Sequence, residues 1–234
     1  MENPFQYVTR YNLPPIKSVI QIGASGGQEI HMFHSNDVDF AVMIEPLQYP
    51  FSILISNCKN RENYLPIQIG VGAEDGILTT FYVASNDGQS SSVLKPAKHL
   101  SIFPYVSFNN EVKVTSYTLD TIARSVKSAH PIFPDYYDLI YIDVQGAELE
   151  VFKGASQSLQ KAMYIFAEVG YGGGYDNDVT YLRLVQYLDE FGFKLVSLDI
   201  DPNTGYGDEF YAKNFEFRNV LSHCSVSNGM DAPT

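Results

Sequence analysis

The 234-residue sequence contains no tryptophan and only two cysteines, Cys58 and Cys224. Two cysteines allow a single disulfide but no disulfide framework, and neither they nor the five histidines have the spacing of a zinc site. His31 and His34 lie three residues apart, but without a third ligand nearby they fit the face of a helix better than a metal site. Disulfide-rich and zinc-dependent classes are therefore not indicated.

Basic residues are also scarce. Lysine and arginine total 15 against 27 aspartates and glutamates, which gives a formal net charge of −12, and no basic run is longer than two residues. Phosphate backbones and anionic membrane surfaces are bound by clusters of lysine and arginine. We therefore expect no nucleic-acid partner, and instead a small or neutral substrate.

Long apolar runs are missing as well, and none approaches the roughly 20 residues that span a bilayer. Residues 1–10 lack the apolar centre of a secretory signal, so we expect a cytoplasmic protein without membrane insertion. Hydrophobic residues make up 45% of the chain and charged residues 18%, a balance that favours a folded domain with a large core over disorder.

Short apolar runs alternate with longer helical patterns. The runs that predict buried strands are 19–22, 40–44, 65–69, 139–142 and 164–167, and the helical patterns are 28–34, 49–56, 148–159 and 179–191. This alternation predicts an α/β fold with a parallel sheet covered on both faces. Two closing runs, 193–198 and 209–212, predict an antiparallel hairpin.

Residues 73–134 form an extra stretch between the third and fourth predicted strands. Within it, 78–83 and 112–118 have β patterns, and 85–92 is rich in Ser, Asn and Gly. We interpret the stretch as an insertion near the active face, so that residues 1–234 form a single domain.

A glycine-rich turn at 23–27 follows the first predicted strand and opens a helix. Glycines let the backbone approach a ligand closely, and a helix N-terminus offers free N–H groups. The glycine spacing matches neither a dinucleotide fingerprint nor a P-loop. Glu45 ends the second predicted strand, 22 residues after Gly23, where an acidic side chain can accept both hydroxyls of a ribose. Together these features predict a nucleoside-binding site.

Two more acids, Asp143 and Glu168, follow the fourth and fifth predicted strands, whose tips we expect to be neighbours. The two carboxylates could bind a divalent cation such as Mg²⁺, or one could act as a base toward a substrate hydroxyl. Glu148 has a simpler explanation, because an acid is favourable in the first turn of a helix. The Gly- and Tyr-rich segment 170–175 is either a lid over the substrate or a flexible connection.

The chain resembles the FkbM family of S-adenosylmethionine-dependent methyltransferases over about residues 19–210. The segments that carry the resemblance are 22–28, 44–46, 118–120, 141–148, 153–155, 168–169 and 192–193. The most specific of them is Asp-Val-Gln-Gly-Ala-Glu at 143–148, followed by Lys-Gly-Ala at 153–155.

The resemblance implies a class I methyltransferase, Rossmann-like fold, with a mostly parallel seven-stranded sheet, an antiparallel last strand and helices on both faces. It implies that S-adenosylmethionine is the cofactor, that Gly23, Ala24, Ser25 and Gly27 line its amino-acid end, and that Glu45 holds its ribose. Many relatives methylate hydroxyls of sugars or natural products. The resemblance therefore implies O-methylation of a small-molecule or glycan acceptor.

Two residues depart from the family pattern. The first strand commonly ends in an acid at the position of Gln21, which would face the methionine ammonium, and many members carry Lys at the position of Tyr141. For catalysis we favour Asp143 as the base and Glu168 second, or a cation shared by both. The rival hypotheses are a dinucleotide-dependent oxidoreductase and a cofactor-binding scaffold or interaction module without turnover.

Overall fold

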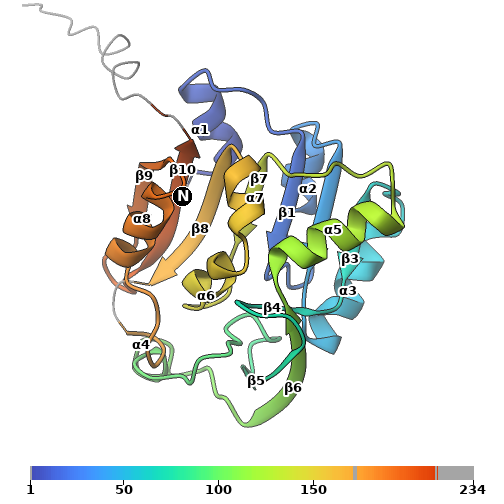
Figure 1. Cartoon of the computed structure of the whole chain (residues 1–234). Coiled ribbons are helices and arrows are strands. Elements are labelled where there is room, and N and C mark those ends of the chain that lie inside the picture. The colour runs from blue at the N-terminus through green and yellow to red at the C-terminus, as the bar shows by residue number, and fades with distance from the viewer. Residues whose placement is uncertain (1, 171–172, 214, 216–234) are drawn as a thin grey trace, which may run out of the picture.

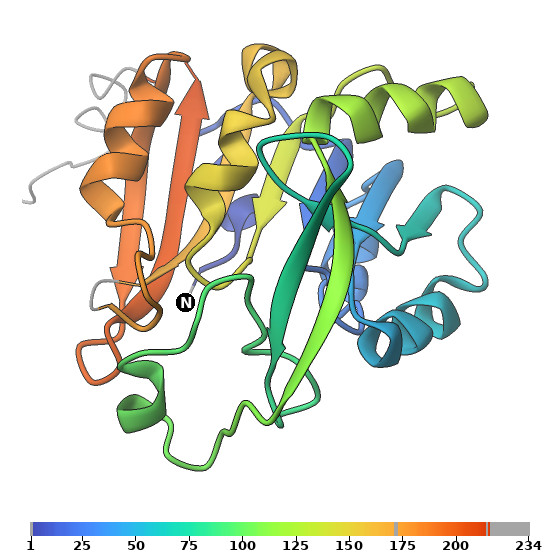
Figure 2. The same cartoon turned by 60° about the horizontal axis from the view of Figure 1, so that its bottom comes forward.

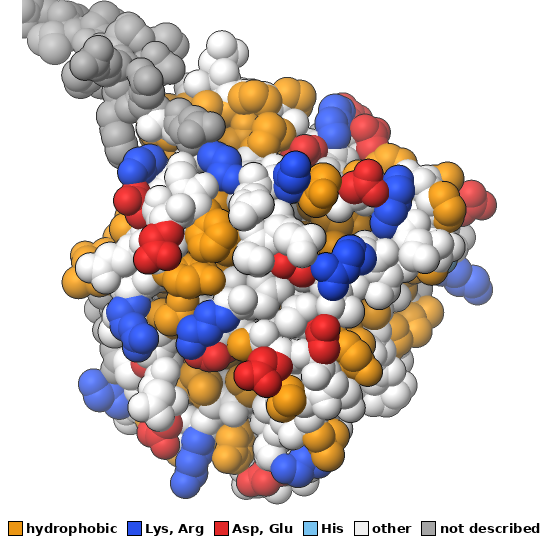
Figure 3. Space-filling model, viewed as in Figure 1, with side chains coloured by type: hydrophobic (Ala, Val, Ile, Leu, Met, Phe, Trp, Pro, Cys, Tyr) orange, Lys and Arg blue, Asp and Glu red, His pale blue; other side chains and the backbone are white. Residues whose placement is uncertain are grey.

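The computed structural model describes residues 2–170, 173–213 and 215 (Figure 1). Cys58 is buried, whereas Cys224, its only possible partner for a disulfide, lies outside the described residues. Within the described ranges, no helix has both the length and the apolar character needed to cross a bilayer. On the face drawn in Figure 3, acidic and basic side chains are interspersed among hydrophobic ones.

The main sheet has seven strands in the order β3-β2-β1-β7-β8-β10-β9. They are β1 (Ser18–Ile22), β2 (Phe40–Ile44), β3 (Tyr64–Ile67), β7 (Leu139–Ile142), β8 (Tyr164–Gly170), β9 (Phe193–Ile200) and β10 (Tyr206–Lys213). Neighbouring strands are parallel except around β10, which is antiparallel to both β8 and β9. The expected seven-stranded sheet, antiparallel last strand and closing hairpin are all confirmed.

Helices cover both faces of this sheet, as expected, because alternate residues of each buried strand point to opposite sides. On one side α1 (Pro4–Arg10), α2 (Ile30–Ser35) and α3 (Gln48–Cys58) pack against the odd-numbered residues of β1. On the other side lie α5 (Leu119–Ala129), α6 (Glu148–Lys153), α7 (Ser156–Lys161) and α8 (Tyr181–Asp189). Asn3 caps α1 with a capping box that includes Gln6.

A second, three-stranded sheet lies between β3 and β7 in sequence, in the order β4-β6-β5. Its strands are β4 (Gly70–Val71), β5 (Ile77–Val83) and β6 (Asn110–Tyr117), and the short α4 (His99–Ile102) connects β5 to β6. Figure 1 shows this sheet at the end of the main sheet toward which β1 and β8 point, and Figure 2 shows β5 and β6 crossing in front of that end. It therefore lies over the carboxyl ends of the parallel strands.

Helix α5 belongs to the main layers although it falls inside the extra stretch 73–134. Leu119, Ile122, Ala123 and Val126 are buried against the main sheet, and the Thr118 side chain caps the helix by accepting the N–H of Thr121. The sequence did not predict that a helix covering the main sheet begins at Leu119, inside this stretch. The division of the chain into one domain with an insertion stays a prediction.

Candidate active site

A cleft opens where β1, β2 and β7 end, beneath the second sheet. It encloses about 920 Å³ of empty space, which includes its opening to solvent. The segments that follow the main-sheet strands line it with Gly23, Ser25, Gln28, Glu29, Glu45, Asp143 and Gln145. The second sheet and its loops line it with Val71, Phe81, Gly88, Gln89, Ser91 and Val93. This mixture of polar and apolar groups is typical of a small-molecule site.

The turn after β1 is held tightly against its neighbours. Gly23 has φ +82°, and a Cβ atom added to it would lie 1.7 Å from the carbonyl oxygen of Asp143. Only glycine fits this position, since any side chain would collide with backbone. Ser25 follows with φ +44°, and its backbone N–H donates to Glu45 Oε2 over 2.9 Å. The turn after β1 is thus fastened to the acid that follows β2.

Glu45 is 6% exposed and lies at the floor of the cleft. Its Oε1 accepts the backbone N–H of Leu47 over 2.8 Å, while its Oε2 accepts that of Ser25. Burial raises the pKa of the Glu45 carboxyl to about 7, although these two backbone hydrogen bonds oppose the rise. Each oxygen keeps a second lone pair, so the carboxylate can still accept hydroxyl groups of a ligand.

Two residues expected at the cofactor do not reach the cleft. Ala24 is fully buried in the core beneath the turn. Gly27, with φ +82°, faces packed side chains, because a Cβ atom there would lie 2.6 Å from Ile30 Cδ1 and 2.8 Å from Leu54 Cδ1. Both residues therefore shape the turn and its packing against α2 and α3, whereas Gly23 and Ser25 line the cleft, and a cofactor contact by Ala24 or Gly27 stays a prediction.

Asp143 and Glu168, expected at neighbouring strand tips, are brought together, and their side chains share a hydrogen bond. The charge of Asp143, and then burial, raise the pKa of Glu168 well above its ordinary value. Burial also raises the pKa of Asp143, but hydrogen bonds from Glu168 and Gln145 counteract part of that rise. Burial and the charge of each acid thus disfavour ionisation of both carboxyl groups at once.

Gln145 joins the two carboxylates and was not singled out from the sequence. Its Nε2 donates to Asp143 Oδ1 over 2.7 Å and to Glu168 Oε2 over 3.2 Å, and its Oε1 accepts the Tyr175 hydroxyl over 3.1 Å. Its φ of +54° is unusual for a residue with a side chain. The available signal was its place beside Asp143 in the most specific segment of the chain.

Further acids surround this pair. Glu148 starts α6, as its helix-terminus interpretation predicts, and its Oε1 accepts the N–H of Gly146 over 3.0 Å. Burial raises the pKa of Glu148 to about 7. Asp208 pairs across the sheet with Glu168, and burial together with the charge of Asp143 raises its pKa to about 6. The carboxyl end of the sheet is thus rich in acids that are costly to ionise.

The metal site and the lid predicted from the sequence involve the carboxylate pair and the segment 170–175. Among the described residues, no group of three or more His, Cys, Asp or Glu side chains is arranged to hold a metal ion, so the cation expected between Asp143 and Glu168 gains no third such ligand. Residues 171–172 of the expected lid lie outside the described residues. The carbonyl of Gly174 accepts backbone N–H groups of Ala97 and His99, and the Tyr175 hydroxyl donates to the carbonyl of Ser90.

Tyr141 is packed rather than poised for chemistry. Its ring contacts those of Phe33 and Phe166, with centroids 6.1 and 5.0 Å apart, and burial raises the pKa of its hydroxyl above the ordinary value. This environment agrees with a strand residue of the core. The position supplies no positive charge to the cleft.

Comparison with known proteins adds one curated relative and several distant solved structures. The 2-O-methyltransferase NoeI of Sinorhizobium fredii (strain NBRC 101917 / NGR234) is 26% identical over 143 residues, which cover 56% of this chain and 56% of that protein. The chain thus spans little more than half the length of the curated relative it matches.

One similar solved structure is a protein of the NADB-Rossmann superfamily from Streptococcus agalactiae, with 13% identity and a TM-score of 0.48; the match covers 92% of this chain and 70% of that chain. Another is fibrillarin of Aeropyrum pernix bound to S-adenosylmethionine, also with 13% identity and a TM-score of 0.48; that match covers 91% of this chain and 70% of that chain.

A family model described as the methyltransferase FkbM domain matches residues 21–195. The matched segment includes the glycine turn, Glu45, and the carboxylate pair with Gln145, and it covers most of the chain. The resemblance noted in the sequence is therefore confirmed, and the chain belongs to the FkbM methyltransferase family.

Proposed function

We propose that the chain is an S-adenosylmethionine-dependent O-methyltransferase whose acceptor is a hydroxyl of a sugar or natural-product-like molecule. The observation that carries this proposal is a half-buried carboxylate pair at the edge of the cleft, with Asp143 among the lining residues and Gln145 hydrogen-bonded to both acids. Family membership supports methyl transfer. The relative named as a 2-O-methyltransferase supports oxygen as the acceptor atom.

The residues at the cleft fit a nucleoside with an amino-acid arm. Gly23 lines the cleft, and its lack of a side chain lets the turn close against the backbone of Asp143. Glu45 presents a buried carboxylate with free lone pairs, as the two hydroxyls of a ribose require. We therefore assign Gly23, Ser25 and Glu45 to cofactor binding.

When bound, the cofactor supplies a methyl group activated by its sulfonium. The protein must then align the acceptor hydroxyl and remove its proton. Asp143 lines the cleft and is our candidate for the base. The raised pKa of Glu168 favours its protonated form beside Asp143, and Gln145 donates hydrogen bonds to both side chains. The proton of the acceptor hydroxyl would then bind to Asp143.

The test is a screen of glycans and other hydroxyl-bearing small molecules for a cofactor-dependent mass gain of one methyl group. We expect the gain with wild-type protein and its loss with Asp143→Asn, both with and without a chelator. Loss of wild-type activity on adding a chelator would instead support a cation held by the pair. A gain on RNA only would refute the sugar or natural-product acceptor, and no gain on any acceptor would support a binding module without turnover.

A further inference from the structure

The amide of Gln145 is a neutral bridge between the two acids of the carboxylate pair, Asp143 and Glu168. Its Nε2 donates to Asp143 Oδ1 over 2.7 Å and to Glu168 Oε2 over 3.2 Å. An amide nitrogen carries two hydrogens, enough for one hydrogen bond to each acid. The hydrogen bond from Gln145 lowers the pKa of Asp143 against the larger effect of burial. The bridge therefore favours the charged form of the acid that we assign as the base.

The far end of the same amide is held by Tyr175. Its hydroxyl lies 3.1 Å from Gln145 Oε1 and 2.7 Å from the carbonyl oxygen of Ser90, and these two acceptors share its single proton. Gln145 is half-buried and lines the cleft, so its long side chain has space to turn away from the acids. Holding such a side chain still costs conformational entropy. Hydrogen bonds at both ends of the amide offset that cost.

Tyr175 is itself fixed by its surroundings. It is 2% exposed, and its ring lies against those of His99 and Phe108, with centroids 5.4 and 6.4 Å apart. Its backbone N–H donates to Asp178 Oδ2 over 3.2 Å. The hydroxyl is therefore a rigid support for the amide rather than one more mobile group.

The backbone of Gln145 is fastened as well. Its φ of +54° is uncommon for a residue with a side chain and persists only where the surrounding structure holds it. Ser92 Oγ donates to the carbonyl of Gln145 over 2.9 Å, and the N–H of Val179 donates to the carbonyl of Gly146 over 3.0 Å. The backbone thus fixes where the side chain starts, which leaves its far end to Tyr175.

We propose that Tyr175 is a positioning residue for the Asp143–Glu168 pair and acts through the amide of Gln145, which rests on the proposed function. Tyr175 holds the amide, and the amide holds the base in its place and favours its charged form. Loss of the tyrosine hydroxyl alone should therefore change the titration of the pair.

Tyr175→Phe keeps the ring and removes only the hydroxyl. NMR of the full chain, with carbon-13 in the carboxyl groups of aspartate and glutamate, follows the titration of the pair without an acceptor. We expect the pKa of Asp143 to be higher in Tyr175→Phe than in wild type, and higher still in Gln145→Met, which lacks the amide. On the acceptor found by the screen, kcat of Tyr175→Phe should fall about two- to twelvefold, the range for one lost hydrogen bond. The acidic limb of its pH profile should move to higher pH, with KM for S-adenosylmethionine unchanged.

Tyr64→Phe is the matched control, because Tyr64 is buried outside the cleft and its hydroxyl donates to the carbonyl of Val38 over 3.2 Å. It should shift neither the titration nor the pH profile. An unchanged titration of Asp143 in Tyr175→Phe would overturn the inference and leave the methyltransferase assignment standing, as would a shifted titration with an unchanged pH profile. No shift in Gln145→Met would overturn it whether or not Tyr175→Phe folds. If wild-type protein methylates no acceptor, the proposed function fails, and the inference fails with it.

Discussion

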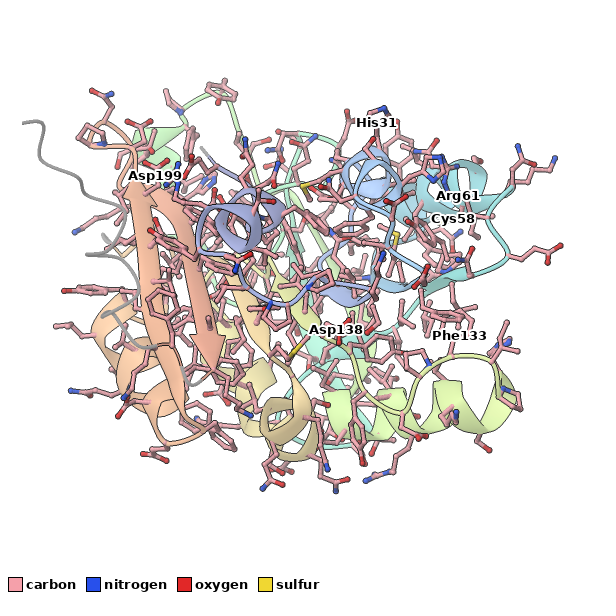
Figure 4. All side chains as sticks on the ribbon, turned by 90° about the horizontal axis from the view of Figure 1, so that it is seen from above. His31, Cys58, Arg61, Phe133, Asp138 and Asp199 are labelled. Atoms are coloured by element: carbon pink, nitrogen blue, oxygen red, sulfur yellow. The ribbon has the colours of Figure 1, made fainter. Side chains whose placement is uncertain are left out.

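The two ends of the main sheet use acidic side chains in different ways. At the amino end, Asp138, labelled in Figure 4, accepts the backbone N–H groups of Lys17 and Ser18 over 2.8 and 2.9 Å and so ties the start of β7 to the start of β1. At the carboxyl end, the half-buried Asp143 and Glu168 lie together, and both have raised pKa values.

This difference separates acids that hold the fold from acids that are candidates for function. Asp138 accepts two backbone N–H groups and is not among the residues that line the cleft. The carboxyl-end acids have no basic residue among the causes of their shifts, so their charges cost stability. Acids held at such a cost at one edge of the sheet, with Glu45 and Asp143 lining the cleft, are candidates for binding and catalysis.

The largest expected effect is on turnover at the carboxyl end. Asp143→Asn keeps the shape of the side chain but removes the base, so turnover should fall by about 10²–10⁴, with little change in cofactor affinity. Turnover and melting temperature should be measured on the same preparation. A destabilised Asp143→Asn protein with near-normal turnover would show that Asp143 serves the fold, like Asp138.

Glu45 should show the next largest effect, on binding. Glu45→Ala removes both carboxylate oxygens from the floor of the cleft, and we expect cofactor binding to weaken by roughly 1.5–3 kcal/mol, the range for hydrogen bonds to charged groups. Calorimetry with S-adenosylhomocysteine measures the loss, with Glu62→Gln as a control for charge. A folded Glu45→Ala protein that binds as tightly as wild type would refute the ribose assignment.

Glu148 should make stability depend on pH. The unfolded glutamate ionises near pH 4.3, whereas burial moves the pKa in the folded protein to about 7. Between these values the folded state binds more protons than the unfolded state, so this group makes stability fall as pH rises. Urea unfolding should show that the free energy of unfolding of Glu148→Gln falls less steeply with pH in this range than that of the wild type, by at most about 1.4 kcal/mol per pH unit. Equal slopes for both proteins would contradict the raised pKa.

The smallest effect is expected at the amino end. Asp138→Asn keeps one acceptor oxygen but loses its charge, so the free energy of unfolding should fall by about 0.5–1.5 kcal/mol, the contribution of one hydrogen bond. Turnover per folded molecule and affinity for S-adenosylhomocysteine should not change. If Asp138→Asn lost turnover as severely as Asp143→Asn, the distinction between the two ends would not hold.

The sequence predicts most of the main sheet because its strands are continuous apolar runs. The runs at 19–22, 40–44, 139–142 and 164–167 all fall within strands, and an acid that ends such a run must emerge at the same edge as its neighbours. Helix α5 was not predicted, although its apolar spacing and the Thr118 cap are present in the sequence. The β patterns that precede it led to the interpretation of the whole segment 73–134 as one insertion.

Contacts that depend on turn geometry could not be predicted. Gln145 reaches both carboxylates only because its backbone has φ +54°. The contact between Gln21 and Glu29 depends on the path of the turn after β1, which brings residues eight positions apart together. Gly27 carried the same sequence signal as Gly23, and only the packing of Ile30 and Leu54 separates their roles.

Calorimetric titration of the wild-type protein with S-adenosylhomocysteine and, separately, with NAD tests most directly whether the carboxyl-end cleft is a methyltransferase cofactor site. We expect saturable binding of S-adenosylhomocysteine that depends on Glu45, and no binding of NAD, because the glycine spacing after β1 does not match a dinucleotide fingerprint. Binding of NAD without binding of S-adenosylhomocysteine would contradict the assignment and favour an oxidoreductase.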